Sequence, residues 1–533
     1  MKKKLSWVFA LICVSQLTFA QVQTGENVAV ANTDAGQVRG YIHNSIYTYK
    51  GIPYAQAKRF EAPQKPKPWQ IVRSSMTYGP VAPLETPTTT TQDEGEFLFH
   101  HDWGYTNENC QALNVWTPAI NDGKKRPVMF WIHGGGFTAG SSQELPSYDG
   151  ENLAKNGDVV VVSINHRLNI LGFLDLSAYG DKYKHSANNS IVDMRIALEW
   201  VKANIAGFGG DPSNVTIFGQ SGGGAKVNAL MAMPSAKGLF HKAINESGAF
   251  RTAMVDKKVT QAIAAEVLKA LNLQPNEVDS LQTIPYAQLV AAGRTALKVT
   301  ADKMKAEGKP VQGLGWGPSV DGDDLPYQVS SKEAYDLSKN IPLLIGTVKN
   351  EFTPFFTAAM NNASMETITE YIKKQQKDKA DAYLAAVKKA YPADTKPSDL
   401  VSVDVTFRPG SVAQANQKSA LNAAPVYMYL FTWQSPVLDG KFKAVHCMEL
   451  PFVFNNIARC EEMTGGGKEA YVLADKMSKA WIQFARTGNP NHKGLPNWPA
   501  YNASNTATMH FDNKCEVMPQ MDKELFALTT PAM

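Results

Sequence analysis

From about residue 125 onward, the chain alternates apolar β-rich runs with helical patterns, and this alternation constrains the fold more than any other feature. Near-continuous apolar runs are typical of parallel strands that are buried on both faces, with helices as the connections between them. The sequence therefore predicts an α/β fold with a mostly parallel central sheet flanked by helices. The expected strands are Val128–Ile132, Val159–Ile164, Val215–Phe218, Pro342–Ile345 and Val426–Phe431.

Helical patterns fill several of the segments between and after these runs. An amphipathic helix is expected from about Ile191 to Ile205, where it would link the second and third runs as neighbouring parallel strands. A second helix, from about Lys468 to Arg486, has an apolar stripe that indicates core packing. The segments 256–305 and 365–392 are also helical in composition. We expect them to be insertions that form a lid or pocket wall.

The N-terminus has the parts of a secretory signal peptide. Residues 2–4 are lysines, residues 5–17 are largely apolar, and Ala20 ends a small-residue cleavage site. A membrane anchor is the alternative, but it needs about 20 apolar residues, and this run is shorter and interrupted by polar residues. We therefore predict a signal peptide at residues 1–20, a secreted or periplasmic location without a stable membrane anchor, and a single domain over residues 21–533.

Composition narrows the classes of partner. The 533 residues are 44% hydrophobic and 19% charged, which excludes a disordered chain. Lys and Arg number 53 against 49 Asp and Glu, so the net charge of +4 lacks the basic excess of a dedicated nucleic-acid binder. We expect a small-molecule partner and no nucleic acid. Four cysteines follow the signal peptide, and the sequence leaves their pairing open: Cys110, Cys447, Cys460 and Cys515.

The segment Gly219-Gln220-Ser221-Gly222-Gly223 fits the pattern G-x-S-x-G. It follows an expected strand and precedes a helix-compatible stretch, Ala225–Met231, which is the setting of a nucleophile elbow that lifts a serine Oγ out of a sharp turn. A glycine turn that holds a helix-capping serine is the alternative interpretation. The context favours Ser221 as a nucleophile, with Gln220 as a candidate pocket residue.

A glycine-rich loop, His133-Gly134-Gly135-Gly136-Phe137, follows the strand that ends at Ile132. Such a loop exposes backbone N–H groups, which can stabilise the oxyanion that forms when a serine attacks an ester. We expect the amides of Gly135, Gly136 and Gly222 to form this oxyanion hole. A phosphate cradle is the competing interpretation, but neither of the glycine-rich phosphate motifs is present.

An attacking serine needs a histidine base and a carboxylate that orients the imidazole. In the order serine, acid, histidine, Glu351 follows the strand at 342–345, and His446 follows the strand at 426–431. We therefore predict Glu351 and His446 as the partners of Ser221. The alternative acids are Asp404 and Asp439, and the alternative histidines are His492 and His510.

Aromatic residues near these positions are candidates for an apolar acyl or alcohol pocket, although plain core packing is the alternative. They are Phe137, Phe352, Phe355 and Phe356. The run His100-His101-Asp102 lacks a convincing set of metal ligands. The sequence thus predicts neither a catalytic metal nor a cofactor.

Several motifs occur in one order along the chain: Tyr49–Ala55, Asn107–Cys110, His133–Phe137, Asn165–Leu168, Ala206–Pro212, Gly219–Gly223 and Glu449–Phe454. In these motifs the chain resembles the type-B carboxylesterase family, which includes cholinesterases and bacterial para-nitrobenzyl esterases. The resemblance implies a single α/β-hydrolase domain, with Ser221 as nucleophile, Glu351 as acid and His446 as base. We hypothesise a secreted carboxylesterase that acts through an acyl-enzyme.

The chain departs from the family pattern around the serine. The family usually has an acidic residue immediately before it, whereas this chain has Gln220, so we expect a weaker attraction for cationic alcohols. The residue after the serine is Gly222, where alanine is common in the family. The cysteine with which the family often pairs the equivalent of Cys110 is absent from residues 79–83, so that disulfide is lost.

Two other functions remain open from the sequence. One is a non-catalytic recognition protein on the same fold, because the family contains adhesion relatives that have lost the nucleophile. The other is acyl transfer or peptide hydrolysis by the same three residues.

Overall fold

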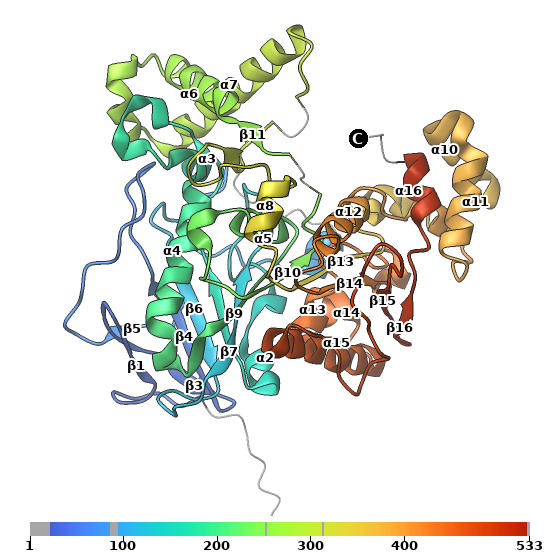
Figure 1. Ribbon diagram of the computed structural model, residues 1–533, viewed down its shortest axis with the longest axis horizontal. Helices are drawn as coiled ribbons and strands as arrows, with labels where there is room; N and C mark the ends of the chain where they lie inside the picture. The colour runs from blue at the N-terminus through green and yellow to red at the C-terminus, as the bar shows by residue number, and fades with distance from the viewer. Residues whose placement is uncertain (1–21, 86–93, 251–252, 312–313, 530–533) are drawn as a thin grey trace, which may run out of the picture.

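The computed structural model describes residues 22–85, 94–250, 253–311 and 314–529. The predicted signal peptide lies outside the described residues. An eleven-stranded sheet runs through the molecule (Figure 1). Its strands lie in the order β16 (Glu516–Met518), β15 (Thr508–Phe511), β14 (Val426–Phe431), β13 (Leu343–Val348), β10 (Lys242–Glu246), β9 (Gly210–Gln220), β7 (Arg126–Ile132), β8 (Val160–Ile164), β6 (Ala112–Thr117), β4 (Ile46–Pro53) and β3 (Tyr41–His43).

Strands β15 to β8 of this sheet pair in parallel, and the pairings at both ends are antiparallel. The predicted fold class, a mostly parallel sheet flanked by helices, is confirmed. Two small sheets accompany it: β1 (Val30–Thr33) with β2 (Gly36–Arg39) and β5 (Arg73–Ser74), and β11 (Val255–Asp256) with β12 (Ser319–Val320).

Sixteen α-helices occur in the described residues. They are α1 (Glu94–Phe99), α2 (Glu151–Gly157), α3 (Asn169–Phe173), α4 (Asn189–Asn204), α5 (Gly222–Met231), α6 (Lys257–Ala270), α7 (Tyr286–Ala306), α8 (Lys332–Leu337), α9 (Thr353–Thr357), α10 (Met365–Gln376), α11 (Ala380–Ala390), α12 (Phe407–Ser419), α13 (Leu450–Val453), α14 (Glu461–Thr464), α15 (Lys468–Thr487) and α16 (Lys523–Thr529).

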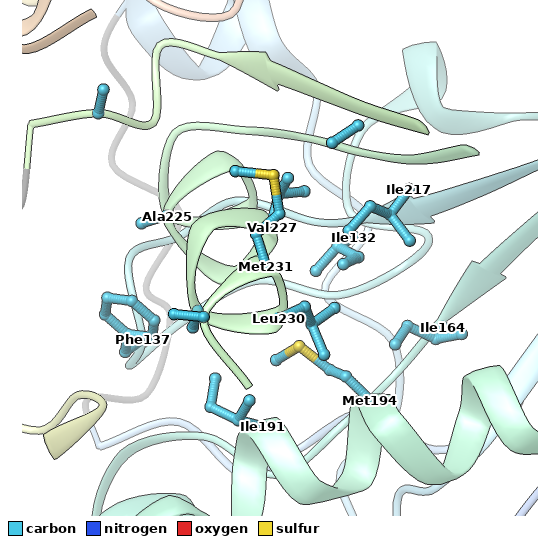
Figure 2. Packing of buried hydrophobic residues seen from close by; sticks show 14 of the residues in the cluster. Ile132, Phe137, Ile164, Ile191, Met194, Ile217, Ala225, Val227, Leu230 and Met231 are labelled. Atoms are coloured by element: carbon cyan, nitrogen blue, oxygen red, sulfur yellow. The ribbon is translucent and has the colours of Figure 1, made fainter. Parts of the chain in front are cut away.

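Helices cover both faces of the sheet, because side chains along a strand point alternately to opposite sides. On β7, Phe130 and Ile132 enter a core shared with α4 and α5, whereas Met129 and Trp131 enter a second core shared with α2 and α15. Figure 2 shows the first core, in which Ile132 and Ile217 of the sheet lie beside side chains of α5. Packing on both faces fixes the carboxyl ends of β7 and β9 beside the start of α5.

One prediction about the connections is wrong. Helix α4 joins β8 to β9, but these two strands are not neighbours, since β7 lies between them and pairs with both. The connection therefore passes across β7. Sequence order alone does not reveal an earlier strand inserted between two later ones.

Candidate active site

Ser221 occupies a strained turn between β9 and α5. Its φ of 57° and ψ of −125° lie outside the regions that side chains normally adopt. Two backbone hydrogen bonds hold the turn, from Ser221 N–H to the Glu246 carbonyl at 2.8 Å and from Ala225 N–H to the Ser221 carbonyl at 3.0 Å. A Cβ at Gly222 would lie 2.1 Å from the Gly136 carbonyl oxygen, so the family's common alanine does not fit this arrangement.

Glu351 and His446 follow the adjacent parallel strands β13 and β14, which brings them together at the same edge of the sheet. Nδ1 of His446 is hydrogen-bonded to Oε2 of Glu351, and the His446 N–H donates to the Glu351 carbonyl at 3.0 Å. The other carboxylate oxygen accepts from Ser247 Oγ at 2.6 Å and from the Val348 N–H at 3.2 Å. Both side chains are buried, and these contacts fix the orientation of the imidazole.

Burial sets the charge of this pair. It lowers the pKa of His446, an effect that the charge of nearby Asp404 partly opposes, and it raises the pKa of Glu351. A lowered pKa keeps the imidazole neutral at neutral pH. His446 is therefore in the form that can accept a proton.

Gln220 lies against the imidazole on the side of the nucleophile. Its Nε2 is 3.2 Å from His446 Nε2, and its Oε1 accepts a hydrogen bond of 3.2 Å from Cys447 Sγ. Within the described residues, no hydrogen bond joins Ser221 Oγ to His446.

The four cysteines after residue 20 are all unpaired thiols in this structure, which answers the question of their pairing that the sequence left open.

The glycine-rich loop after β7 faces the start of α5. Gly135 and Gly136 have φ values of +76° and +61°, a left-handed conformation that favours glycine. Within the described part of the chain, the amides of Gly135, Gly136 and Gly222 donate to no protein acceptor. Unpaired N–H groups beside a strained serine are the kind of donor that can stabilise an oxyanion.

A cavity of about 310 Å³ opens over these groups. Phe352 stacks on His446 with ring centroids 4.1 Å apart, and Phe355 stacks on Phe99 with ring centroids 6.3 Å apart. The cavity is lined by Phe99, His101, Gly134, Gly135, Gly136, Glu144, Leu145, Tyr148, Gln220, Ser221, Phe352, Phe355, His446 and Cys447.

The two helical insertions, segments 256–305 and 365–392, do not line this cavity. Helices α6 and α7 pack against each other, α11 packs against α16, and no residue lining the cavity belongs to these helices. Figure 1 shows the two pairs at separate margins of the molecule. These helices therefore do not form the wall of this cavity, and their role as a lid stays a prediction.

The predicted pocket phenylalanines have different surroundings. Phe352 and Phe355 line the cavity, and each residue is 39% exposed. Phe137 is buried, packs edge-to-face on Phe173, and borders a smaller cavity beside Ala225. Phe356 is 77% exposed and does not line either cavity.

The alternative acids and histidines do not take the place of Glu351 and His446. Asp404 accepts backbone N–H groups at the start of α12, from Thr406, Phe407 and Arg408. None of the others lines the cavity: Asp439, His492 and His510. Sequence reasoning missed Ser247. Its position just after β10, at the same edge of the sheet as Glu351, is the signal that could have found it.

His101 lines the cavity and is paired rather than free. Its Nδ1 lies 2.7 Å from Glu96 Oε2, and its ring stacks on Trp103.

Over the described ranges, no group of three or more His, Cys, Asp and Glu side chains could hold a metal ion. Among those same residues, no helix has the length and hydropathy needed to cross a bilayer.

Comparison with known proteins places this geometry in a family. The profile of the carboxylesterase family matches residues 27–528. The chain belongs to the carboxylesterase family. Para-nitrobenzyl esterase of Bacillus subtilis (strain 168) is 36% identical to it over 508 residues, covering 93% of this chain and 97% of the relative. Phenmedipham hydrolase of Pseudarthrobacter oxydans is 33% identical, covering 90% and 94%.

Solved structures agree with this assignment. An esterase from Clostridium hathewayi, described as able to hydrolyse aliphatic aromatic polyesters, superposes on this carboxylesterase with a TM-score of 0.84. The two chains are 38% identical, and the match covers 96% of this chain and 99% of the other. A thermophilic PNB esterase gives a TM-score of 0.74 at 34% identity. The resemblance to type-B carboxylesterases is thus confirmed.

Proposed function

We propose that this carboxylesterase hydrolyses esters through a triad of Ser221, His446 and Glu351 and an acyl-enzyme intermediate. The observation that carries the proposal is the buried Glu351–His446 hydrogen bond near a strained serine and three amides that have no acceptor among the described residues. These groups are of the kinds that the successive steps of ester hydrolysis use, which supports the proposal.

In the first half of the reaction, Ser221 Oγ attacks the ester carbonyl carbon, and its proton passes to His446 Nε2. The carbonyl oxygen becomes an oxyanion that accepts from the amides of Gly135, Gly136 and Gly222. The oxyanion then re-forms the carbonyl as the bond to the alcohol oxygen breaks, and His446 gives that oxygen the proton. Glu351 stabilises the imidazolium throughout.

In the second half, water attacks the acyl carbon and gives a proton to His446. The bond from that carbon to Ser221 Oγ then breaks, His446 returns the proton to Oγ, and the carboxylic acid leaves. We place the hydrogen bond between Ser221 and His446 in the substrate complex, since catalytic hydrogen bonds often tighten only there. Gln220 Nε2 must leave His446 Nε2 for that bond to form.

The substrate class follows from the cavity. Its aromatic lining and volume of about 310 Å³ favour an ester with an apolar or aromatic group. The exposed rings of Phe352 and Phe355 at its mouth favour a second candidate substrate, an aliphatic–aromatic oligoester that extends out of the cavity. The similarity to the C. hathewayi esterase supports this candidate.

A panel of esters tests the proposal, with acetates, long-chain acyl esters, benzoates and a soluble aromatic diester supplied to wild type and Ser221→Ala. We expect hydrolysis that favours the aromatic esters and a loss of about 10³-fold or more in kcat for Ser221→Ala. Equal activity of Ser221→Ala would contradict the triad. If the only activity were peptide hydrolysis or acyl transfer to an acceptor, the protein would be a peptidase or an acyltransferase. An inactive but folded wild type would favour a recognition protein.

We also propose that the protein is exported. The lysines at residues 2–4, the apolar stretch that follows and the site at Ala20 support this proposal. The intact mass of protein isolated from the periplasm or medium should correspond to a chain beginning at Gln21. A full-length mass confined to the cytoplasm would contradict it.

A further inference from the structure

A buried lysine lies directly behind the glycine-rich loop. Lys226 is on α5, five residues after Ser221, and its side chain is 0% exposed. Its Nζ donates to the carbonyl oxygens of His133 at 3.0 Å and Gly134 at 3.2 Å. A lysine is seldom fully buried without hydrogen-bonding partners, because its charge must be removed from water.

One of these carbonyls belongs to a peptide unit that also faces the active site. The carbonyl of Gly134 and the N–H of Gly135 are the two ends of one planar peptide group. The carbonyl receives Nζ of Lys226 and also lies 3.0 Å from Nδ1 of His133. The Gly135 N–H at the opposite end has no protein acceptor within the described residues, and the cavity is lined by Gly135.

Donation to the carbonyl of a peptide makes its N–H a stronger donor, because hydrogen bonds in a chain polarise one another. A positive charge behind the carbonyl adds to this effect in a site with little water. Lys226 Nζ, which donates to the carbonyl at the other end of this peptide group, therefore makes the Gly135 N–H a stronger donor. The same contacts fix the direction of the N–H before substrate arrives.

The described groups around Lys226 are acidic or neutral, so none of them repels a positive charge on its ammonium group. Burial lowers its pKa to about 7, and the carboxylate of Glu144 opposes that shift. The nearby rings of His133 and His166 stack at 4.7 Å, and burial lowers both of their pKa values well below normal, so they are neutral neighbours. The Phe137 ring lies 5.9 Å from Nζ.

We propose that Lys226 is a positioning residue that strengthens the oxyanion hole through the peptide between Gly134 and Gly135. This inference rests on the proposed function. Lys226 does not touch the substrate, and it acts when negative charge develops on the carbonyl oxygen. Its contribution should therefore appear in the transition state and not in ground-state binding.

The test compares Lys226→Met with Lys418→Met at about pH 6. Lys418 is a matched control, since it is also a buried lysine on a helix that donates to a main-chain carbonyl, that of Ser338. We expect Lys226→Met to lower kcat by about 10- to 30-fold with KM within about twofold, which is less than the loss of a direct oxyanion donor. Lys418→Met should retain wild-type kcat.

A second measurement separates charge from loop packing. A trifluoromethyl ketone reacts reversibly with Ser221 by forming a bond from Oγ to the carbonyl carbon; the serine proton goes to His446, and the oxygen becomes an alkoxide. Affinity for this ketone should fall with kcat in Lys226→Met, and Lys226→Gln, which keeps a neutral donor, should not restore it. The affinity of a neutral, non-covalent ester analogue should stay unchanged.

Four results would overturn the inference. Three of them are an unchanged kcat in Lys226→Met, equal losses in Lys226→Met and Lys418→Met, and a parallel loss of affinity for the ketone and the neutral analogue. Full recovery by Lys226→Gln would also overturn it, because it would show that the hydrogen bond acts without the charge. An inactive wild type would instead be a failure of the proposed function.

Discussion

Glu351, which is hydrogen-bonded to the cavity-lining His446, is 1% exposed and accepts three hydrogen bonds, from Ser247, the Val348 amide and His446. Phe355, on the rim, is 39% exposed and packs against neighbouring aromatic rings, one stacked and two tilted. We call these two regions the polar floor (Ser221, Glu351, His446 and the glycine loop) and the aromatic rim (Phe99, Phe352 and Phe355).

The difference shows how one cavity combines chemistry with recognition. Charge moves on the floor, where several bonds to each group fix its position and burial strengthens every electrostatic contact. The rim has no charge to control, so dispersion contacts between partly exposed rings are sufficient. Substitutions on the floor should therefore change kcat, whereas substitutions on the rim should change KM.

The largest effect is expected at the acid of the floor. Glu351→Gln keeps the size of the side chain but removes the charge that stabilises the imidazolium, so kcat should fall by about 10³- to 10⁴-fold. Asp404→Asn is the matched control, because Asp404 is also a buried carboxylate and instead caps the start of α12. Steady-state kinetics on a para-nitrophenyl ester measure both. A larger loss in Asp404→Asn would mean that the acid has been assigned to the wrong carboxylate.

A second prediction concerns Gln220, where the floor meets the cavity. Gln220→Glu places a carboxylate about 3.2 Å from His446 Nε2 and should raise the pKa of His446. Since the reaction needs the neutral imidazole, activity on the acid side should then be lost at a higher pH. The acid limb of the kcat/KM profile should move up by about one unit or more.

The control for this shift is Gln220→Met, which removes the amide without adding charge. Its acid limb should stay near that of wild type. An acid limb that does not move in Gln220→Glu would show that the side chain at residue 220 does not sense the imidazole.

The smallest effect is expected on the rim. Phe355→Ala should raise KM for an aromatic ester by about 2- to 10-fold, the equivalent of one aromatic contact, with kcat nearly unchanged. Phe356→Ala is the control, because Phe356 is 77% exposed and does not line the cavity. A large fall in kcat for Phe355→Ala would break the distinction between floor and rim.

Much of the sheet was predictable because its strands are continuous apolar runs. The expected run Val426–Phe431 coincides with β14, and the runs at 128–132 and 159–164 lie within one or two residues of β7 and β8. Strand β10, Lys242–Glu246, was missed because it is short and has charged residues at both ends. The order of β8, β7 and β9 depends on crossovers that no local pattern records.

The residues around the site show the same limit. Ser221, Glu351 and His446 follow strands at one edge of a parallel sheet, so their proximity could be anticipated. The burial of Lys226 could not, because a lysine in a sequence reads as exposed. Likewise, Phe355 and Phe356 are adjacent in sequence, and the direction of a short helix decides which one lines the cavity.

The most direct test of the account is the mass of the intact protein after treatment with a fluorophosphonate, which labels an activated serine without any choice of substrate. We predict one adduct on the wild-type protein and none on a folded Ser221→Ala variant. An adduct that persists in Ser221→Ala, or a folded wild type that takes up no label, would contradict the assignment of Ser221 as an activated nucleophile.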